Sequence, residues 1–304
     1  MSHSSILNTP AIAELPIQKV KSGSLLETND SVAVEEPLEI RLVYGPAGQR
    51  VEQGISVTMR TPGHDDELAI GFLFTEGIIP DASAILSIDQ DDAHAGDMPR
   101  QTSGPNGSSV NRGMPGGCVR IHLREGIALD LGRLQRHFYT SSSCGVCGKS
   151  SIEALRTVCP PRGKTEEATP LDASLLYKLP PLLRQGQDIF DTTGGLHAAA
   201  LFDRKGNLLS LREDIGRHNA LDKVIGQALQ QTGIPLSANI LLLSGRACFE
   251  LIQKAAMAGI NIIAAVGPPS SLAVQLAEEQ GMTLVGFLRQ ERFNIYSGAH
   301  RIRV

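Results

Sequence analysis

Apolar and polar side chains alternate along three short segments in the first half of the chain: Leu38–Val43, Ile55–Met59 and Val119–Leu123. A period of two residues is typical of strands that bury one face. We therefore expect three half-buried strands here.

A buried helix is expected between the second and third of these strands. Pro62 and Gly63 end the extended segment, and the side chains of residues 68–74 are apolar on nearly every helical face. Asp65 is suited to cap this helix at its start, and Gly77 to end it.

The last third of the chain alternates strand and helix patterns. Residues 196–202 and 208–211 flank a Gly-containing turn and predict a hairpin. Residues 240–243, 261–266 and 283–288 predict three further strands with a helix between each pair. This order implies parallel strands joined by right-handed crossovers, and hence an α/β sandwich.

The helix starts in this region have candidate caps. Asp214 and Asn219 come before an apolar helical stripe that runs from Leu221 to Leu229, and both are suited to cap that helix. Ser270 precedes the last helix, and Gly281 is expected to end it.

Three regions differ in composition, and they suggest the domain organisation. Residues 1–35 are mixed polar and predict a loosely ordered lead-in, 36–140 a smaller β-rich N-terminal domain, and 141–304 the α/β domain. Gly, Pro, Ser, Asn and Asp dominate residues 89–117, which predicts a mobile insertion between two strands.

Composition excludes several classes of protein. The 304 residues carry a net charge of −4, which argues against bulk binding to nucleic acid or to an anionic membrane. The N-terminus lacks a secretory signal pattern, and no apolar run approaches the ~18 residues that span a bilayer. Five cysteines are a poor fit to a secreted disulfide framework, so we expect a reduced, cytoplasmic protein.

Two of the cysteines, Cys144 and Cys147, form a CxxC pair between glycines. A capping box from Ser150 to Glu153 begins a helix directly after the pair, and Lys149 adds a cation. The helix dipole and the cation both lower the pKa of a thiol and favour the thiolate. A thiolate attacks sulfur, so the pair is suited to accept a sulfane sulfur from a donor persulfide.

Three other interpretations of the pair stay open from the residues alone. In the first, the pair is half of a structural zinc site, and the protein is a zinc-stabilised binding module. In the second it is a thioredoxin-type redox pair, and in the third the two thiols only pack in the core. A zinc site would need further ligands from scattered single residues, namely Cys118, Cys159, Cys248, His197 and His218. A zinc deaminase is disfavoured, because its His-x-Glu and Pro-Cys-x-x-Cys signature is missing.

Polar residues gather where several predicted strands end, which is where α/β sheets usually bind ligands. Arg289 and Arg292 flank a turn after the last strand and are suited to hold phosphates, although an ordinary basic surface turn fits equally. The aromatic rings suited to face a flat ligand are Phe287, Phe293 and Tyr296. The polar segments suited either to rim a pocket or only to form turns and caps are Gly194–Gly195, Arg212–Asn219 and Ser244–Arg246.

Taken together, these segments resemble the formate dehydrogenase accessory sulfurtransferases, the FdhD family. The resemblance covers most of the chain and runs in order through TMRTPGHDDELAIGFLFTEGII, SSSCGVCGK, FDTTGGLHAAALF, REDIGRHNALDKVIG, LLSGRACFELIQKAAMAGI and GFLRQERFNIYSG. The 89–117 insertion and the polar N-terminus depart from the family pattern without interrupting a motif.

The resemblance implies a sulfur relay. Family members take sulfur from a cysteine desulfurase as a persulfide and pass it to the bis(molybdopterin guanine dinucleotide) molybdenum cofactor, which formate dehydrogenase then uses. The persulfide cysteine matches Cys144, with Cys147 as its partner. The cofactor-binding segment matches Phe287, Leu288, Arg289, Gln290, Glu291 and Arg292. The resemblance also implies a cytidine-deaminase-like three-layer fold and a homodimer. A cofactor-binding chaperone without covalent sulfur transfer is the alternative.

Overall fold

The computed structural model describes residues 11–93, 116–127, 129 and 169–304. The CxxC loop with Cys144 and Cys147 lies outside the described residues, as does most of the expected insertion at 89–117. The ends of that insertion belong to strands β5 (Ile85–Ala93) and β6 (Gly116–Leu123), which pair antiparallel.

The three strands expected in the first half are confirmed, and they lie in a four-stranded sheet. Its order is β4 (Val51–Arg60), β3 (Glu36–Tyr44), β6 and β5. The pairing of β3 with β6 is parallel and the other two pairings are antiparallel. Leu38, Ile40 and Leu42 alternate along one face of β3 and are fully buried, as the period of two predicts.

The buried helix is confirmed as α1 (Asp65–Thr75), but its expected cap is wrong. His64 occupies the N-cap position in the left-handed region with φ 58°, and it makes no side-chain cap. The carboxylate of Asp65 is engaged elsewhere, because it accepts hydrogen bonds from Nε and Nη2 of Arg60 at 3.0 and 2.7 Å. A buried guanidinium thus draws the carboxylate away from the helix start.

The second sheet has six strands in the order β13-β12-β11-β10-β8-β9. The predicted hairpin is confirmed, because β8 pairs antiparallel with β9, and the three central strands β10, β11 and β12 are parallel as predicted. The strands are β8 (His197–Phe202), β9 (Leu208–Asp214), β10 (Ile240–Leu243), β11 (Ile262–Ala265), β12 (Thr283–Gly286) and β13 (Asn294–Ser297).

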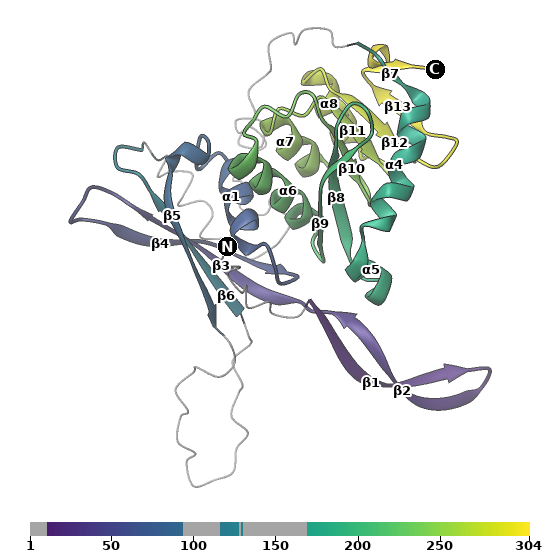
Figure 1. The fold of residues 1–304 in the computed structure, drawn as a ribbon, viewed down its shortest axis with the longest axis horizontal. Coiled ribbons are helices and arrows are strands. Elements are labelled where there is room, and N and C mark those ends of the chain that lie inside the picture. Colours follow the sequence, from purple (N-terminus) through teal and green to yellow (C-terminus); the bar gives the residue numbers. More distant parts are fainter. Residues whose placement is uncertain (1–10, 94–115, 128, 130–168) are drawn as a thin grey trace, which may run out of the picture.

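Helices cover both faces of the six-stranded sheet (Figure 1). On one side lie α6 (Arg217–Gln231), α7 (Phe249–Met257) and α8 (Ser271–Glu279), and on the other lies α4 (Ala173–Gln185). The short helix α5 (Asp188–Thr193) follows α4. None of the helices among the described residues is long and apolar enough to cross a membrane.

The expected caps of these helices meet different outcomes. Ser270 caps α8 as predicted, because its hydroxyl accepts a hydrogen bond from Ala273 N at 3.3 Å. Gly216 is the N-cap of α6, so neither Asp214 nor Asn219 holds that position. The Asp214 carboxylate accepts instead from Gly216 N at 2.8 Å and from Asn219 Nδ2 at 3.0 Å, which ties the turn before the helix together.

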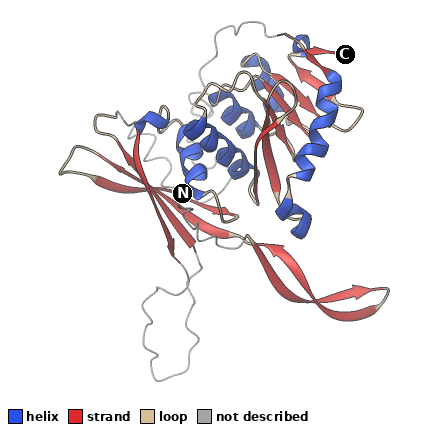
Figure 2. Cartoon of the chain, viewed as in Figure 1, coloured by secondary structure: helices blue, strands red, loops and turns tan. Residues whose placement is uncertain are grey.

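The layers pack against one another through two apolar cores. The larger one lies between the four-stranded sheet, helices α1, α6, α7 and α8, and one face of the six-stranded sheet; it includes Ile40 and Leu241. The smaller one lies between the other face of that sheet and α4, and it includes Leu179 and Ala200. Figure 2 shows the resulting order of layers: sheet, helices, sheet, helix.

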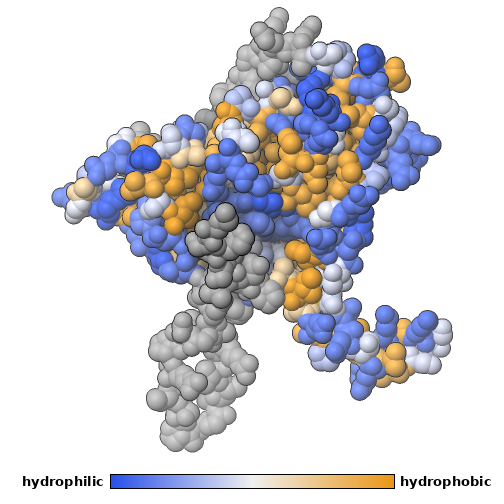
Figure 3. Space-filling view, in the orientation of Figure 1, coloured by the Kyte–Doolittle hydropathy of each residue, from blue (hydrophilic) through white to orange (hydrophobic). Residues whose placement is uncertain are grey.

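The expectation of a loosely ordered lead-in over residues 1–35 is wrong for its described part. β1 (Ile12–Lys21) and β2 (Ser24–Ala33) form a hairpin that projects from the body of the molecule (Figure 1). Side chains on both strands are exposed, among them Leu15 and Leu25, and apolar residues lie among polar ones along the arm in Figure 3. Its structure comes from backbone pairing rather than from burial.

Four short elements complete the described part of the fold. β7 (Leu171–Asp172) and β14 (Ile302–Arg303) pair in parallel near the C-terminus, and two short 3-10 helices span Ala82–Ala84 and Ala299–Arg301.

Candidate ligand pocket and side-chain clusters

The segment 287–292 leaves the sheet at the carboxyl end of β12. Backbone hydrogen bonds attach it to the end of β11 and to the chain that follows, because Leu288 N donates to Ala265 O at 3.0 Å and Phe287 N donates to Gly267 O at 3.1 Å. Leu288 is fully buried in the smaller core. The segment is therefore held at the edge where parallel strands end, the usual ligand position of such sheets.

Arg289 and Arg292 close a turn but differ in what their side chains do. Arg289 N donates to Arg292 O at 2.9 Å, and Arg289 Nη1 donates to the carbonyl oxygens of Val266 and Leu288 at 2.6 and 2.9 Å. The guanidinium of Arg289 thus fixes the loop. Arg292 is exposed, so its charge is available to a ligand.

A pocket of about 810 Å³ lies between this turn and helix α4. Its volume is in the range of small-molecule and cofactor sites, roughly 300–1,000 Å³. Three arginines and one glutamate line it, so its net charge favours an anionic ligand. The lining residues are Pro180, Pro181, Arg184, Gln185, Val266, Leu288, Arg289, Gln290, Glu291 and Arg292.

Of the three aromatic rings considered for a flat ligand, only Phe287 is exposed, at 42%. Phe293 packs against Tyr177 with ring centroids 5.5 Å apart and contributes to the smaller core. Tyr296 packs against the larger core. Two of the three rings are therefore engaged inside the fold.

The acidic and basic residues before α6 are mostly structural rather than a pocket rim. Asp214 is fully buried, pairs with Lys223 Nζ at 2.7 Å and accepts from Thr61 N at 3.2 Å. Arg212 donates twice to the Glu67 carboxylate, at 2.6 and 2.7 Å. These pairs join the second sheet to α1 and to the end of β4.

The pocket is not lined by Gly194–Gly195 or by Arg217–His218, as far as the described residues define it. Gly194 ends α5 in the left-handed region, and Arg217 begins α6 on the opposite face of the sheet from α4. Nearby, burial and the charges of Arg217 and Arg246 lower the pKa of His197.

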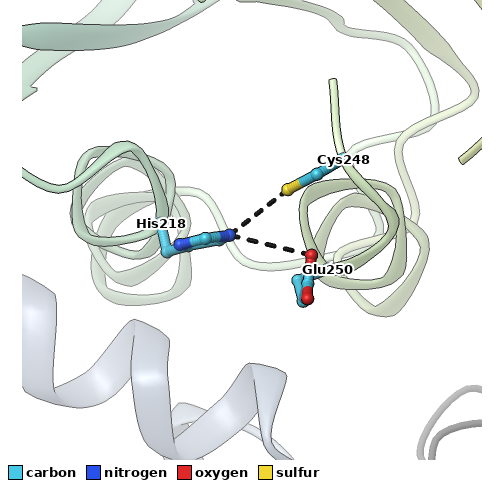
Figure 4. A group of neighbouring side chains, drawn as sticks. All are labelled: His218, Cys248 and Glu250. Carbon is cyan, nitrogen blue, oxygen red and sulfur yellow. Dashed lines mark hydrogen bonds and ion pairs between the residues drawn. The ribbon is translucent and has the colours of Figure 1, made fainter. Parts of the chain in front are cut away.

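Two cysteines lie among the described residues, and both are free thiols. Burial raises the pKa of Cys118, on β6. Cys248 lies 3.3 Å from Nε2 of His218, and Glu250 approaches the same imidazole nitrogen (Figure 4).

Some of these positions have little or no signal in the sequence. Cys248 looks isolated there because His218 is thirty residues away, and only the packing of α6 against α7 brings the two together. The contribution of Pro180, Pro181 and Arg184 to the pocket has no sequence signal, because it depends on how α4 packs on the sheet.

Comparison with known proteins gives a consistent result. The family model described as FdhD/NarQ matches residues 33–303. The sulfur carrier protein FdhD of Streptomyces avermitilis is 46% identical over 286 residues, covering 93% of this chain and 93% of the relative. The protein of the same name from Mycolicibacterium paratuberculosis is 49% identical and covers 94% of this chain and 97% of the relative.

A solved structure supports the fold. The crystal structure of a putative formate dehydrogenase accessory protein from Desulfotalea psychrophila superposes with a TM-score of 0.66 at 23% identity, covering 97% of this chain and all of that one. With the family model matched over nearly the whole chain and curated relatives well above 40% identical, this protein belongs to the FdhD/NarQ family.

Proposed function

We propose that this protein is a cytoplasmic sulfur carrier that serves formate dehydrogenase. The Cys144 thiolate attacks the outer sulfur of a persulfide on a cysteine desulfurase. The S–S bond of the donor breaks, the donor cysteine leaves as a thiolate, and Cys144 becomes the persulfide. Cys147 assists by protecting or relaying that sulfur, which then passes to the bis(molybdopterin guanine dinucleotide) molybdenum cofactor as substrate.

The observation that carries this proposal is the extent of the match to proteins named sulfur carriers. At 46% and 49% identity the alignment covers more than nine-tenths of both chains in each case. The CxxC pair supplies the chemistry such a carrier needs, because a thiolate is the sulfur nucleophile.

The basic pocket supports the second half of the proposal. A guanine dinucleotide has a pyrophosphate and a flat base, and the pocket offers Arg292 to the former, whereas Arg184 is paired with Asp191. The exposed ring of Phe287, at the start of the same turn, is suited to stack on the latter. Arg289 would act by holding the turn in place as well as by its charge.

Two further properties follow the family resemblance. We propose a homodimer, and a cytidine-deaminase-like α/β half in which the helices on the two faces of the six-stranded sheet make three layers. The helices α6–α8 and α4 on opposite faces of that sheet support the layering.

Intact-mass analysis tests the sulfur transfer. After incubation with a cysteine desulfurase and cysteine, the wild type is expected to gain the mass of one sulfur atom, and Cys144→Ala is not. Cys118→Ser is the matched control and should gain sulfur as the wild type does, because Cys118 lies on β6 in the four-stranded sheet. If the wild type gains no sulfur, or Cys144→Ala gains as much, the transfer proposal is wrong.

Guanosine diphosphate is the probe for the pocket. Calorimetric titration should give roughly tenfold weaker binding for Arg292→Gln, because a charge-assisted hydrogen bond is worth about 1.5 kcal/mol or more. Arg124→Gln, an exposed arginine after β6, is the control and should bind as the wild type does. Equal affinity of all three proteins would contradict the assignment of the pocket.

The pocket alone also fits a cofactor-binding chaperone that does not transfer sulfur. In that case Cys144→Ala would bind guanosine diphosphate normally and still support an active formate dehydrogenase. The sulfur-carrier proposal expects normal nucleotide binding with an inactive client enzyme.

A further inference from the structure

We propose that His218, Cys248 and Glu250 form a binding site for one divalent transition-metal ion, with zinc as the best match. The three residues come from two helices that pack together. His218 is the second residue of α6, Cys248 directly precedes α7, and Glu250 is the second residue of α7. Their ligand atoms point toward one another across the helix pair (Figure 4).

The separations of the ligand atoms suit a tetrahedral ion. His218 Nε2 lies 3.3 Å from Cys248 Sγ and 3.9 Å from the Glu250 carboxylate, and the three ligand atoms all lie within 4.8 Å of one another. Ligands at zinc bond lengths and tetrahedral angles are about 3.3–3.6 Å apart. The cluster therefore needs only small rotamer adjustments to close around an ion.

The three residue types are all common ligands of zinc. An imidazole nitrogen, a cysteine sulfur and a carboxylate oxygen each bind Zn²⁺ in proteins. Cysteine binds the ion as a thiolate, so metal binding would release the thiol proton of Cys248.

The surrounding charges are compatible with a dication. A Cys248 thiolate and the Glu250 carboxylate together carry two negative charges, which balance the ion. The nearby ammonium group of Lys254 is already paired with Asp222 at 2.9 Å and with Glu76 at 3.4 Å. Arg217 also faces Cys248, so its positive charge lies beside the site.

The site is partly open. The side chains of His218 and Glu250 are 13% and 21% exposed, which leaves an entry path from solvent. Three protein ligands of the N, S and O types with an open fourth position are the arrangement of zinc sites that bind water or substrate. None of the three residues lines the basic pocket, and the proposed sulfur transfer uses none of them, so the site goes beyond that proposal.

Cobalt(II) substitution tests the site directly. The full-length chain with Cys144→Ala and Cys147→Ala removes the CxxC pair as a competing metal ligand. After treatment with a chelator, titration of this protein with Co²⁺ should give a sulfur-to-cobalt charge-transfer band in the near ultraviolet that saturates at one ion per chain. Adding Cys118→Ser, the other described cysteine, should leave the band unchanged.

Three ligand variants decide whether the band comes from this cluster. Adding Cys248→Ser should abolish it, and adding His218→Gln or Glu250→Gln should weaken Co²⁺ binding at least about tenfold, a loss that even outer partners of a metal site produce. A band that survives Cys248→Ser would place the ion on another cysteine and overturn the proposal, as would the absence of any band. If Cys248→Ser does not fold, the partly exposed Glu250→Gln decides the question: unchanged Co²⁺ affinity in that variant would overturn the proposal. No sulfur transfer is measured, so failure here leaves the proposed function untouched.

Discussion

Charged side chains inside this molecule join segments that are far apart in the sequence. Lys254 on α7 is buried and bonds to Asp222 on α6, to Glu76 after α1 and to Thr75 at 2.8 Å. Asp222 is buried as well and accepts from Thr75 at 2.9 Å. One ammonium group thus holds three helices together, and removing the charge of Asp222 would leave Glu76, at 3.4 Å, as the remaining carboxylate that compensates this buried cation.

Asp222→Asn should therefore destabilise the protein. The side chain keeps its size but loses the charge opposite Lys254, so we expect the free energy of unfolding to fall by about 3 kcal/mol or more in urea denaturation. Glu278→Gln, an exposed acid on α8, is the control and should change it by less than about 0.5 kcal/mol. A loss for Asp222→Asn as small as that of the control would show that the pair is unimportant.

The site residues were only partly predictable from the sequence. The basic turn with Arg289 and Arg292 could be found because it follows a predicted strand at the ligand-binding edge. The sequence could not tell that Arg289 bonds to backbone carbonyls while Arg292 stays exposed, since that depends on the path of the chain after β11. It also could not bring His218 to Cys248, which needs the packing of α6 on α7.

At the scale of elements, helices α1 and α6 approach each other more closely than side chains would allow. A Cβ atom added at Gly71 would lie 1.9 Å from the carbonyl oxygen of Asp222, and one at Gly226 would lie 1.8 Å from that of Glu67. Each helix thus presents a glycine to the backbone of the other. The contact matters because α1 belongs to the first half of the chain and α6 to the second.

Gly71→Ala and Gly226→Ala should each force these helices apart. Overpacking against a rigid backbone costs about 1–3 kcal/mol or more, and we expect the midpoint of thermal unfolding to fall accordingly. Gly195→Ala is a suitable control, because its nearest neighbours would be 3.9 Å away and its φ is not left-handed. Wild-type midpoints for both helix variants would mean that the helices separate at no cost.

Strands were predicted correctly where burial gives the sequence an apolar pattern, and they were missed where the strands are exposed. The parallel strands β10 to β12 have four buried residues each, and their apolar runs were clear. The β1–β2 hairpin is mostly exposed, so its sequence has no apolar face to reveal it. Its one local signal is the Ser22–Gly23 turn, in which both residues have positive φ, at 50° and 81°, as in tight hairpin turns.

At the scale of the whole molecule, the larger core is shared by both halves of the chain. It contains Leu38 and Leu68 from the first half together with Leu221 and Leu241 from the second, all almost completely buried. The sequence suggested a boundary near residue 140 from composition. It could not show that α1 would pack against α6 and α7, because the apolar character of a helix does not identify the element against which it packs.

The two halves should therefore unfold together. We expect one transition in calorimetry, with the calorimetric enthalpy equal to the van't Hoff enthalpy. In hydrogen exchange followed across a urea series, the amides of β3 and β10 should lose protection at the same urea concentration, because the same core covers both strands. Two resolved transitions, or earlier loss of protection in β3, would show that the halves are independent.

The backbone conformation of Phe287 is unfavourable for any residue that has a Cβ atom. Its φ is 54°, in the left-handed region where a non-glycine residue costs about 1–2 kcal/mol, and its ring is 42% exposed. Phe287→Gly should thus raise the urea midpoint of unfolding while weakening the binding of guanosine diphosphate, whereas Phe287→Ala should weaken binding without the gain in midpoint. Stability and affinity would then move in opposite directions at a single position, which is the behaviour expected of a ring that serves a ligand rather than the fold.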